Sequence, residues 1–241
     1  MDRKAPKHFV LVAGLWHGGW AWDRVAPLLR ARGHQVTAIT QTGLGERSHL
    51  LSKDITVTTF VEDVVNTLAW RELRDVILVG HSFGGISVTG AADRVPDRIA
   101  KLIYLDGAVM EDGETWFGLL PYDIVSARIK EAQGETVGLS IPPAPVETFG
   151  ITDPKDKAFL EARMTPHPFN TFTTRLNLKH EIGNGLPVEY IACVDPVYPP
   201  AVSAHKRARE KGWRISELKT GHEAMVLAPA ETAELLDALS G

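Results

Sequence analysis

The sequence is poor in the features that mark secreted and membrane proteins. Its 241 residues include one cysteine, Cys193, so an internal disulfide cannot form. The apolar run from 190 to 194 around this cysteine favours a buried structural thiol. No apolar run reaches the roughly 20 residues that a membrane span requires, and residues 1–7 lack the apolar core of a secretion signal. We therefore expect a cytoplasmic protein that does not associate with membranes.

The sequence also has no large excess of positive or negative residues. Lys and Arg number 26 against 30 Asp and Glu, which gives a formal net charge of −4. This mild acidity gives no reason to expect nucleic acid or an anionic membrane surface as a partner. The sequence also lacks the second histidine of a zinc-binding helix after His222, so we expect no metal. A homodimer is compatible with the sequence, which does not specify the oligomeric state.

Strand-like and helix-like segments alternate in both parts of the chain. The expected strands are 8–12, 35–40, 75–79, 101–105, 188–194 and 214–219. The expected helices are 22–32, 59–70, 83–94, 200–211 and 230–239. Such alternation indicates an α/β fold with a mostly parallel, doubly wound sheet.

The alternation breaks between residues 108 and 186, which are rich in Pro, Gly and aromatic residues. A structureless loop of this length is improbable in a compact domain, so we interpret the segment as a cap of short helices. The prediction is one domain, with a core made of 1–107 and 187–241 and the cap 108–186 inserted over the C-terminal edge of the sheet. In open α/β sheets, ligands bind at that edge.

The strongest motif is Gly-His-Ser-Phe-Gly-Gly at 80–85, between an expected strand and an expected helix. This context is typical of a nucleophile elbow, in which a strained turn lifts a serine hydroxyl out of the sheet. Ser82 is therefore the predicted nucleophile. Two backbone N–H groups should hold the oxyanion, that of Phe83 after the nucleophile and that of Leu15 in the loop after the first strand.

A serine nucleophile needs a base, and the base needs an orienting acid. His222 follows the last expected strand and is the predicted base, while His205 lies among Lys and Arg in a helix and is expected to be solvated. Asp195, after the preceding strand, is the favoured acid. Asp106, at the end of the strand 101–105, is the alternative, because a neighbouring strand end can present an acid to the same histidine.

With these residues assembled, the chain resembles the α/β-hydrolases related to plant methylesterases and hydroxynitrile lyases, whose bacterial relatives hydrolyse pyrethroid and carbamate esters. The resemblance lies in His17-Gly18-Gly19-Trp20, residues 42–47, the elbow, Leu105-Asp106-Gly107 and the segment 221–225. The separation of Asp195 from His222 is also similar. Two departures are Ala13, where the family usually has histidine, and Glu223, where the lyases have a lysine that receives cyanide.

The resemblance implies an α/β-hydrolase fold and a serine carboxylesterase that needs no cofactor. The expected substrates are small to medium hydrophobic or aromatic esters, carbamate esters included. The cap should supply an apolar pocket, and its expected lining, with the oxyanion loop, is Trp16, Trp116, Phe117 and Leu120. Two alternatives stay open at this point: a hydroxynitrile lyase or another cofactor-free reaction, and a receptor-like binding protein with little turnover.

Overall fold

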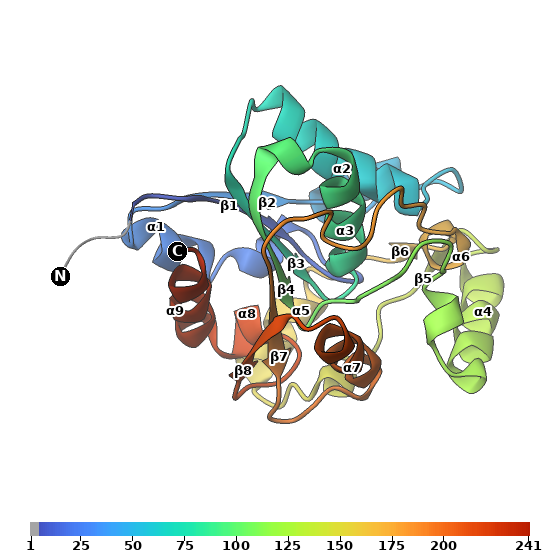
Figure 1. Cartoon of the computed structure of the whole chain (residues 1–241). Coiled ribbons are helices and arrows are strands. Elements are labelled where there is room, and N and C mark those ends of the chain that lie inside the picture. Colours follow the sequence, from blue (N-terminus) through green and yellow to red (C-terminus); the bar gives the residue numbers. More distant parts are fainter. Residues whose placement is uncertain (1–4) are drawn as a thin grey trace.

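A computed structural model describes residues 5–241 of the chain (Figure 1). Its centre is a six-stranded sheet in the order β2-β1-β3-β4-β7-β8, in which every neighbouring pair is parallel. The strands are β1 (His8–Val12), β2 (Gln35–Ile39), β3 (Val76–His81), β4 (Ile99–Leu105), β7 (Val188–Cys193) and β8 (Arg214–Leu218). The predicted parallel α/β sheet is confirmed, and the long break in alternation falls between β4 and β7.

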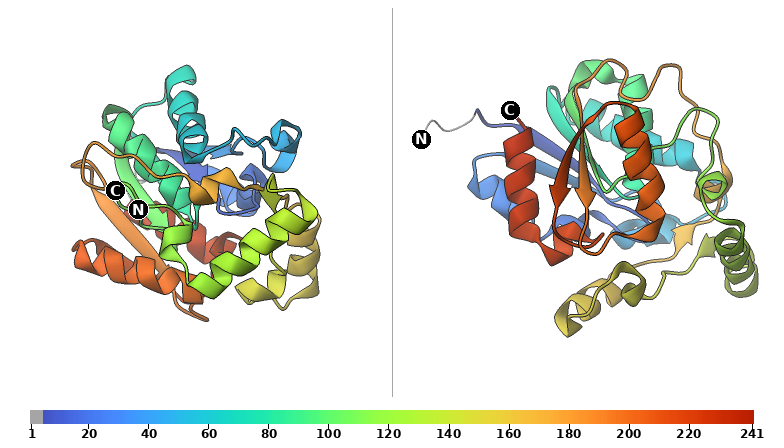
Figure 2. Two further views of the ribbon diagram at one scale, coloured as in Figure 1. Left: turned by 90° about the vertical axis from the view of Figure 1, so that its right-hand side faces the viewer. Right: turned by 60° about the horizontal axis from the view of Figure 1, so that its bottom comes forward.

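Helices cover both faces of the sheet. They are α1 (Ala26–Ala31), α2 (Val57–Trp70), α3 (Gly84–Arg94), α7 (Val202–Glu210), α8 (Ala224–Leu227) and α9 (Pro229–Leu239). Figure 2 shows α7 and α9 on opposite sides of β7 and β8. The helix expected from 22 begins only at Ala26, because Pro27 lacks an N–H and is tolerated only in a first turn. A 3₁₀ turn, Gly19–Trp22, precedes it.

Alternate residues of the strands enter two separate cores. Phe9 and Leu11 of β1 pack with α1 and α9, whereas Val10 and Val12 pack with α2 and α3. The same alternation holds in the central strand β3, whose six residues are all buried. A strand buried on both faces is expected to be a continuous apolar run, and this is why β3 could be identified from its composition.

The segment between β4 and β7 forms short elements, most of which lie at the right of Figure 1, whereas α5 lies at its lower centre. They include α4 (Tyr122–Glu135), β5 (Ser140–Ile141), α5 (Pro154–Glu161), β6 (His167–Pro168) and α6 (Asn170–Thr173). Strands β5 and β6 pair antiparallel in a small sheet of their own. Within residues 5–241, every helix is too short or too polar to cross a lipid bilayer.

Candidate active site

Ser82 lies in the sharp turn between β3 and α3. Its backbone has φ of +51°, in the left-handed region that residues with a side chain seldom adopt. The turn requires a glycine at position 84, where a Cβ would lie 2.6 Å from the carbonyl oxygen of Ala13 and 2.7 Å from that of Val12. The turn therefore holds the serine at the C-terminal edge of the sheet, as the motif predicts.

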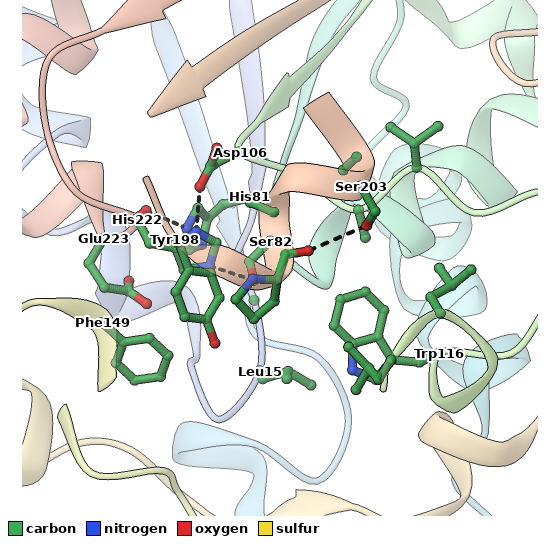
Figure 3. A pocket seen from close by; sticks show the side chains of 18 of the residues that line it. Leu15, His81, Ser82, Asp106, Trp116, Phe149, Tyr198, Ser203, His222 and Glu223 are labelled. Carbon is green, nitrogen blue, oxygen red and sulfur yellow. Dashed lines mark hydrogen bonds and ion pairs between the residues drawn. The ribbon is translucent and has the colours of Figure 1, made fainter. Parts of the chain in front are cut away.

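A chain of hydrogen bonds runs from Ser82 through His222 to Asp106 (Figure 3). The Ser82 hydroxyl lies 2.9 Å from His222 Nε2, and His222 Nδ1 lies 2.6 Å from Asp106 Oδ2. His222 sits between β8 and α8, and its carbonyl oxygen accepts a hydrogen bond from His81 Nε2 at 2.9 Å. Because a carboxylate can only accept, Nδ1 carries the proton and Nε2 is free to accept the serine proton.

The acid that contacts His222 is Asp106, and the expectation that Asp195 does so is wrong. Asp195 lies two residues past the end of β7 with its side chain exposed, and its backbone N–H donates to the carbonyl oxygen of Thr220 at 3.1 Å. Asp106 follows β4 directly and is 2% exposed. The strand next to the nucleophile's own strand therefore presents the acid, which is the alternative derived from the sequence.

Asp106 also contacts a second histidine, and this corrects the expectation that His205 is solvated. His205 Nε2 lies 2.6 Å from Asp106 Oδ1, and the backbone N–H of Cys193 donates to the same oxygen at 3.1 Å. Burial by itself raises the pKa of Asp106, but the hydrogen bonds from His205 and His222 outweigh it and hold the pKa well below its usual range. Asp106 is consequently ionised at neutral pH.

The loop after β1 approaches the elbow closely. A Cβ on Gly14 would lie 2.6 Å from Ser82 Cβ, so only glycine lets the loop come this near. The carbonyl oxygen of the next residue, Leu15, accepts a hydrogen bond from His17 Nδ1 at 2.6 Å. Within the described part of the chain, neither the Leu15 nor the Phe83 N–H donates to a protein acceptor. The two predicted oxyanion donors are therefore free to bind a ligand oxygen.

A pocket opens above these residues, and most of its lining is apolar. Trp16, Trp116 and Leu120 line it, as expected, and Leu119, Phe149, Tyr198 and Ala204 lie there as well. Phe117 is not part of the lining, because its ring packs at 6.0 Å from that of Phe169 and at 5.1 Å from that of Phe172. The expectation for Phe117 is therefore wrong, since the side chain holds the inserted segment together.

Two residues of the site are absent from the sequence-based prediction: Tyr198, which lies against His222, and His205, which contacts Asp106. The Tyr198 ring lies 4.3 Å from the His222 ring, centre to centre, and covers it on the pocket side (Figure 3). Burial raises the pKa of Tyr198 to about 12, so its hydroxyl remains neutral. His205 could have been found from its helix, since Ala201, Ala204 and Ala208 mark an apolar face that His205 adjoins.

Glu223, directly after His222, is a buried acid at the pocket. Burial raises its pKa, but the neighbouring His17, His81 and His222 outweigh burial, so the net pKa is lowered. Its oxygen lies 3.6 Å from His17 Nε2. His81, His222 and Glu223 could offer ligand atoms to a metal ion, all within 4.8 Å of one another. An ion bound to His222 would displace either Ser82 or Asp106 from the ring, because both nitrogens are already bonded.

Comparisons with known proteins identify the family to which the chain belongs. The model of the alpha/beta hydrolase family matches residues 9–235. A carbendazim hydrolyzing esterase of Nocardioides sp. (strain SG-4G) is 37% identical over 96% of this chain and 99% of its own length. Methylesterase 10 of Arabidopsis thaliana is 27% identical over 100% of this chain and 94% of its own.

Among solved structures, an extracellular alpha/beta-hydrolase from a Paenibacillus species matches with a TM-score of 0.86. It is 25% identical, and the match covers 98% of this chain and 99% of the other. The family match and the esterase relative each span nearly the whole length, which settles the class of protein. The chain belongs to the alpha/beta hydrolase family.

Proposed function

We propose that this chain is a serine esterase that hydrolyses esters of small to medium hydrophobic or aromatic compounds through an acyl-enzyme. The observation that carries the proposal is the buried Ser82–His222–Asp106 chain of hydrogen bonds at the base of a largely apolar pocket. The esterase names of two relatives that span the chain support it. The carbendazim-hydrolysing relative, at 37% identity, supports carbamate esters as one substrate group.

In the first half-reaction, Ser82 Oγ attacks the ester carbonyl carbon while His222 Nε2 takes the hydroxyl proton. The N–H groups of Leu15 and Phe83 hold the negative oxygen of the tetrahedral intermediate. Asp106 keeps His222 in the required tautomer and stabilises the imidazolium ion. His222 then protonates the leaving alkoxide, and the alcohol departs from the acyl-enzyme.

The second half-reaction repeats these roles with water. His222 takes a proton from a water molecule, the hydroxide attacks the acyl carbon, and the same two N–H groups hold the new oxyanion. Collapse of this intermediate breaks the bond to Ser82 Oγ, and His222 returns the proton to that oxygen. The carboxylic acid leaves, or carbamic acid when the substrate is a carbamate ester.

The charge beside His222 favours hydrolysis over cyanohydrin cleavage. Glu223 is a buried carboxylate whose pKa is lowered, so it places negative charge next to the histidine. A departing cyanide ion would need positive charge at this position. The receptor-like alternative, the cytoplasmic location and the homodimer stay predictions.

Hydrolysis of p-nitrophenyl acetate, butyrate and octanoate in the presence of EDTA tests the proposal. Wild type should turn over, and Ser82→Ala should lose roughly 10⁵-fold or more in kcat. Ser203→Ala is a matched control, because this pocket serine contacts the Pro200 carbonyl oxygen rather than an imidazole, and it should retain turnover. Lack of turnover by folded wild type, or equal activity in Ser82→Ala, would reject the proposal.

A further inference from the structure

Asp106 is shared between two histidines that reach it from different elements. His222 Nδ1 lies 2.6 Å from Oδ2, and His205 Nε2 lies 2.6 Å from Oδ1. The backbone N–H of Cys193 also donates to Oδ1, at 3.1 Å. All three side chains are buried, with exposed fractions of 2% for Asp106, 3% for His222 and 5% for His205. Each carboxylate oxygen thus has a donor, and only one of the two oxygens faces the catalytic histidine.

The position of the acid explains why a second donor is needed. Asp106 has φ of +46°, so it sits at a sharp bend directly after β4, where the side chain could otherwise rotate about its own bonds. His205 lies on α7, and its ring packs edge-on against Tyr190 of β7, with ring centres 5.7 Å apart. The ring is therefore fixed by the core on one side, and it contacts the carboxylate on the other.

We propose that His205 is a positioning residue for the catalytic acid: with the Cys193 N–H it fixes Asp106 Oδ1, so that Oδ2 meets His222 Nδ1. This inference rests on the proposed function. Charge-assisted hydrogen bonds are short and directional, and the two imidazole contacts of Asp106 are both of this length. Without the His205 N–H, the carboxylate keeps one donor on Oδ1 and gains freedom to rotate away from His222.

Two substitutions at 205 separate positioning from folding. His205→Leu removes the N–H, whereas His205→Gln keeps an N–H donor on a flexible chain. We expect His205→Leu to lower kcat for p-nitrophenyl butyrate roughly tenfold or more with KM within about twofold, as loss of a hydrogen bond to a charged group implies. His205→Gln should recover most of kcat. His180→Leu is the control, because His180 also pairs with an aspartate, Asp93 at 3.0 Å, but its side chain is half exposed and does not line the pocket.

A second measurement does not depend on turnover. The proton that His222 Nδ1 donates to Asp106 should give a far-downfield NMR signal, assigned by its absence in Asp106→Asn. This signal should persist in wild type, His205→Gln and His180→Leu, and should be lost or move upfield in folded His205→Leu. If wild type showed this signal pattern but did not turn over esters, the proposed esterase activity would be rejected. The role of His205 in positioning Asp106 would still be supported.

Three results would overturn the role of His205. One is that folded His205→Leu has the same downfield signal and the same kcat as wild type. Another is a change confined to KM, which would mean that His205 only holds α7, whose Ala204 lines the pocket. The third is equal loss of kcat in both variants with the downfield signal intact, which would indicate a role in folding alone.

Discussion

At the residue scale, two adjacent rings of the inserted segment perform different tasks. Trp116 lines the pocket and packs against the Phe83 ring with centres 5.5 Å apart. Phe117 turns toward α6 and contacts Phe169 and Phe172. Substrate contact and packing are therefore assigned to neighbours in the chain, and they can be separated by substitution.

Trp116→Ala should weaken substrate binding without much loss of stability. We expect kcat/KM for p-nitrophenyl octanoate to fall by about tenfold, because a large apolar wall is removed from the pocket. Phe117→Ala should instead lower the free energy of unfolding by about 2 kcal/mol while kcat/KM changes little. Steady-state kinetics and urea unfolding of both variants check this. If Trp116→Ala mainly lowered the stability and Phe117→Ala mainly lowered kcat/KM, Phe117 rather than Trp116 would line the pocket.

The sequence could not distinguish these two rings. Trp116 precedes a single 3₁₀ turn, Phe117–Leu119, and Phe117 begins it. The turn is too short for a periodic pattern to show which side faces the core. The identity of Ser82 and His222 was accessible because a local motif and a strand end fix each of them. Asp106 and Asp195 both follow strand ends, so the pattern allowed either, and only burial and direction decide between them.

At the scale of elements, the elbow depends on close contact between the start of α3 and the end of β1. The contact leaves no room for a Cβ at Gly84, because the nearest atoms are carbonyl oxygens of the backbone and cannot move aside as a side chain would. The same helix start determines where Phe83 N–H points. Packing at this junction is therefore tied to the geometry of the oxyanion donors.

Gly84→Ala should both destabilise the protein and slow the reaction. We expect the free energy of unfolding to fall by about 2 kcal/mol or more, as for overpacking in a close-packed core. Gly134→Ala in α4 is a matched control, since its Cβ would meet nothing within 4 Å, and it should be stabilising by about 0.5 kcal/mol. Chemical denaturation of both variants gives the comparison. A neutral Gly84→Ala would contradict the close contact described for the elbow.

Most elements of the core were predictable, because each combines an apolar run with a clear end. Strand β1 has the predicted bounds, and β3 extends two residues beyond the prediction to His81, where the elbow begins. The inserted segment was predictable only as a set of short helices. Its β5 and β6 pair through two residues each, and so short a pairing leaves no alternation in the sequence.

At the scale of the whole molecule, buried neutral histidines make stability depend on pH. Burial lowers the pKa of His81 to about 4 and that of His167 to about 3, from an ordinary value of 6.5. His167 lies among the rings of Phe60, Phe83 and Phe172, and its Nδ1 accepts the backbone N–H of Trp16 at 3.1 Å. It therefore links the inserted segment to the oxyanion loop.

The direction of the pH effect follows from these values. Below pH 6.5 the unfolded chain takes up protons at these rings and the folded protein does not, so stability is present above 6.5 and is lost as pH falls toward 3. His167→Gln keeps an acceptor for the Trp16 N–H without a titrating ring. Between pH 7 and pH 5, the free energy of unfolding of His167→Gln should therefore fall by about 2 kcal/mol less than that of wild type.

Urea unfolding at the two pH values measures this difference. His49→Gln is the control, because His49 is exposed, and it should follow the wild-type pH dependence. An identical pH dependence in His167→Gln and wild type would show that His167 does not remain neutral in the folded protein.

The identity of the acid that orients His222 is best tested by comparing Asp106→Asn with Asp195→Asn in the steady-state hydrolysis of p-nitrophenyl butyrate. Asp106→Asn should lower kcat/KM by roughly 10⁴-fold, because the amide cannot hold His222 in the tautomer that accepts the Ser82 proton. Asp195→Asn should stay within about threefold of wild type, since its side chain is exposed and the acid that contacts His222 is Asp106. A severe loss in Asp195→Asn with a nearly normal Asp106→Asn would contradict the assignment of the catalytic acid.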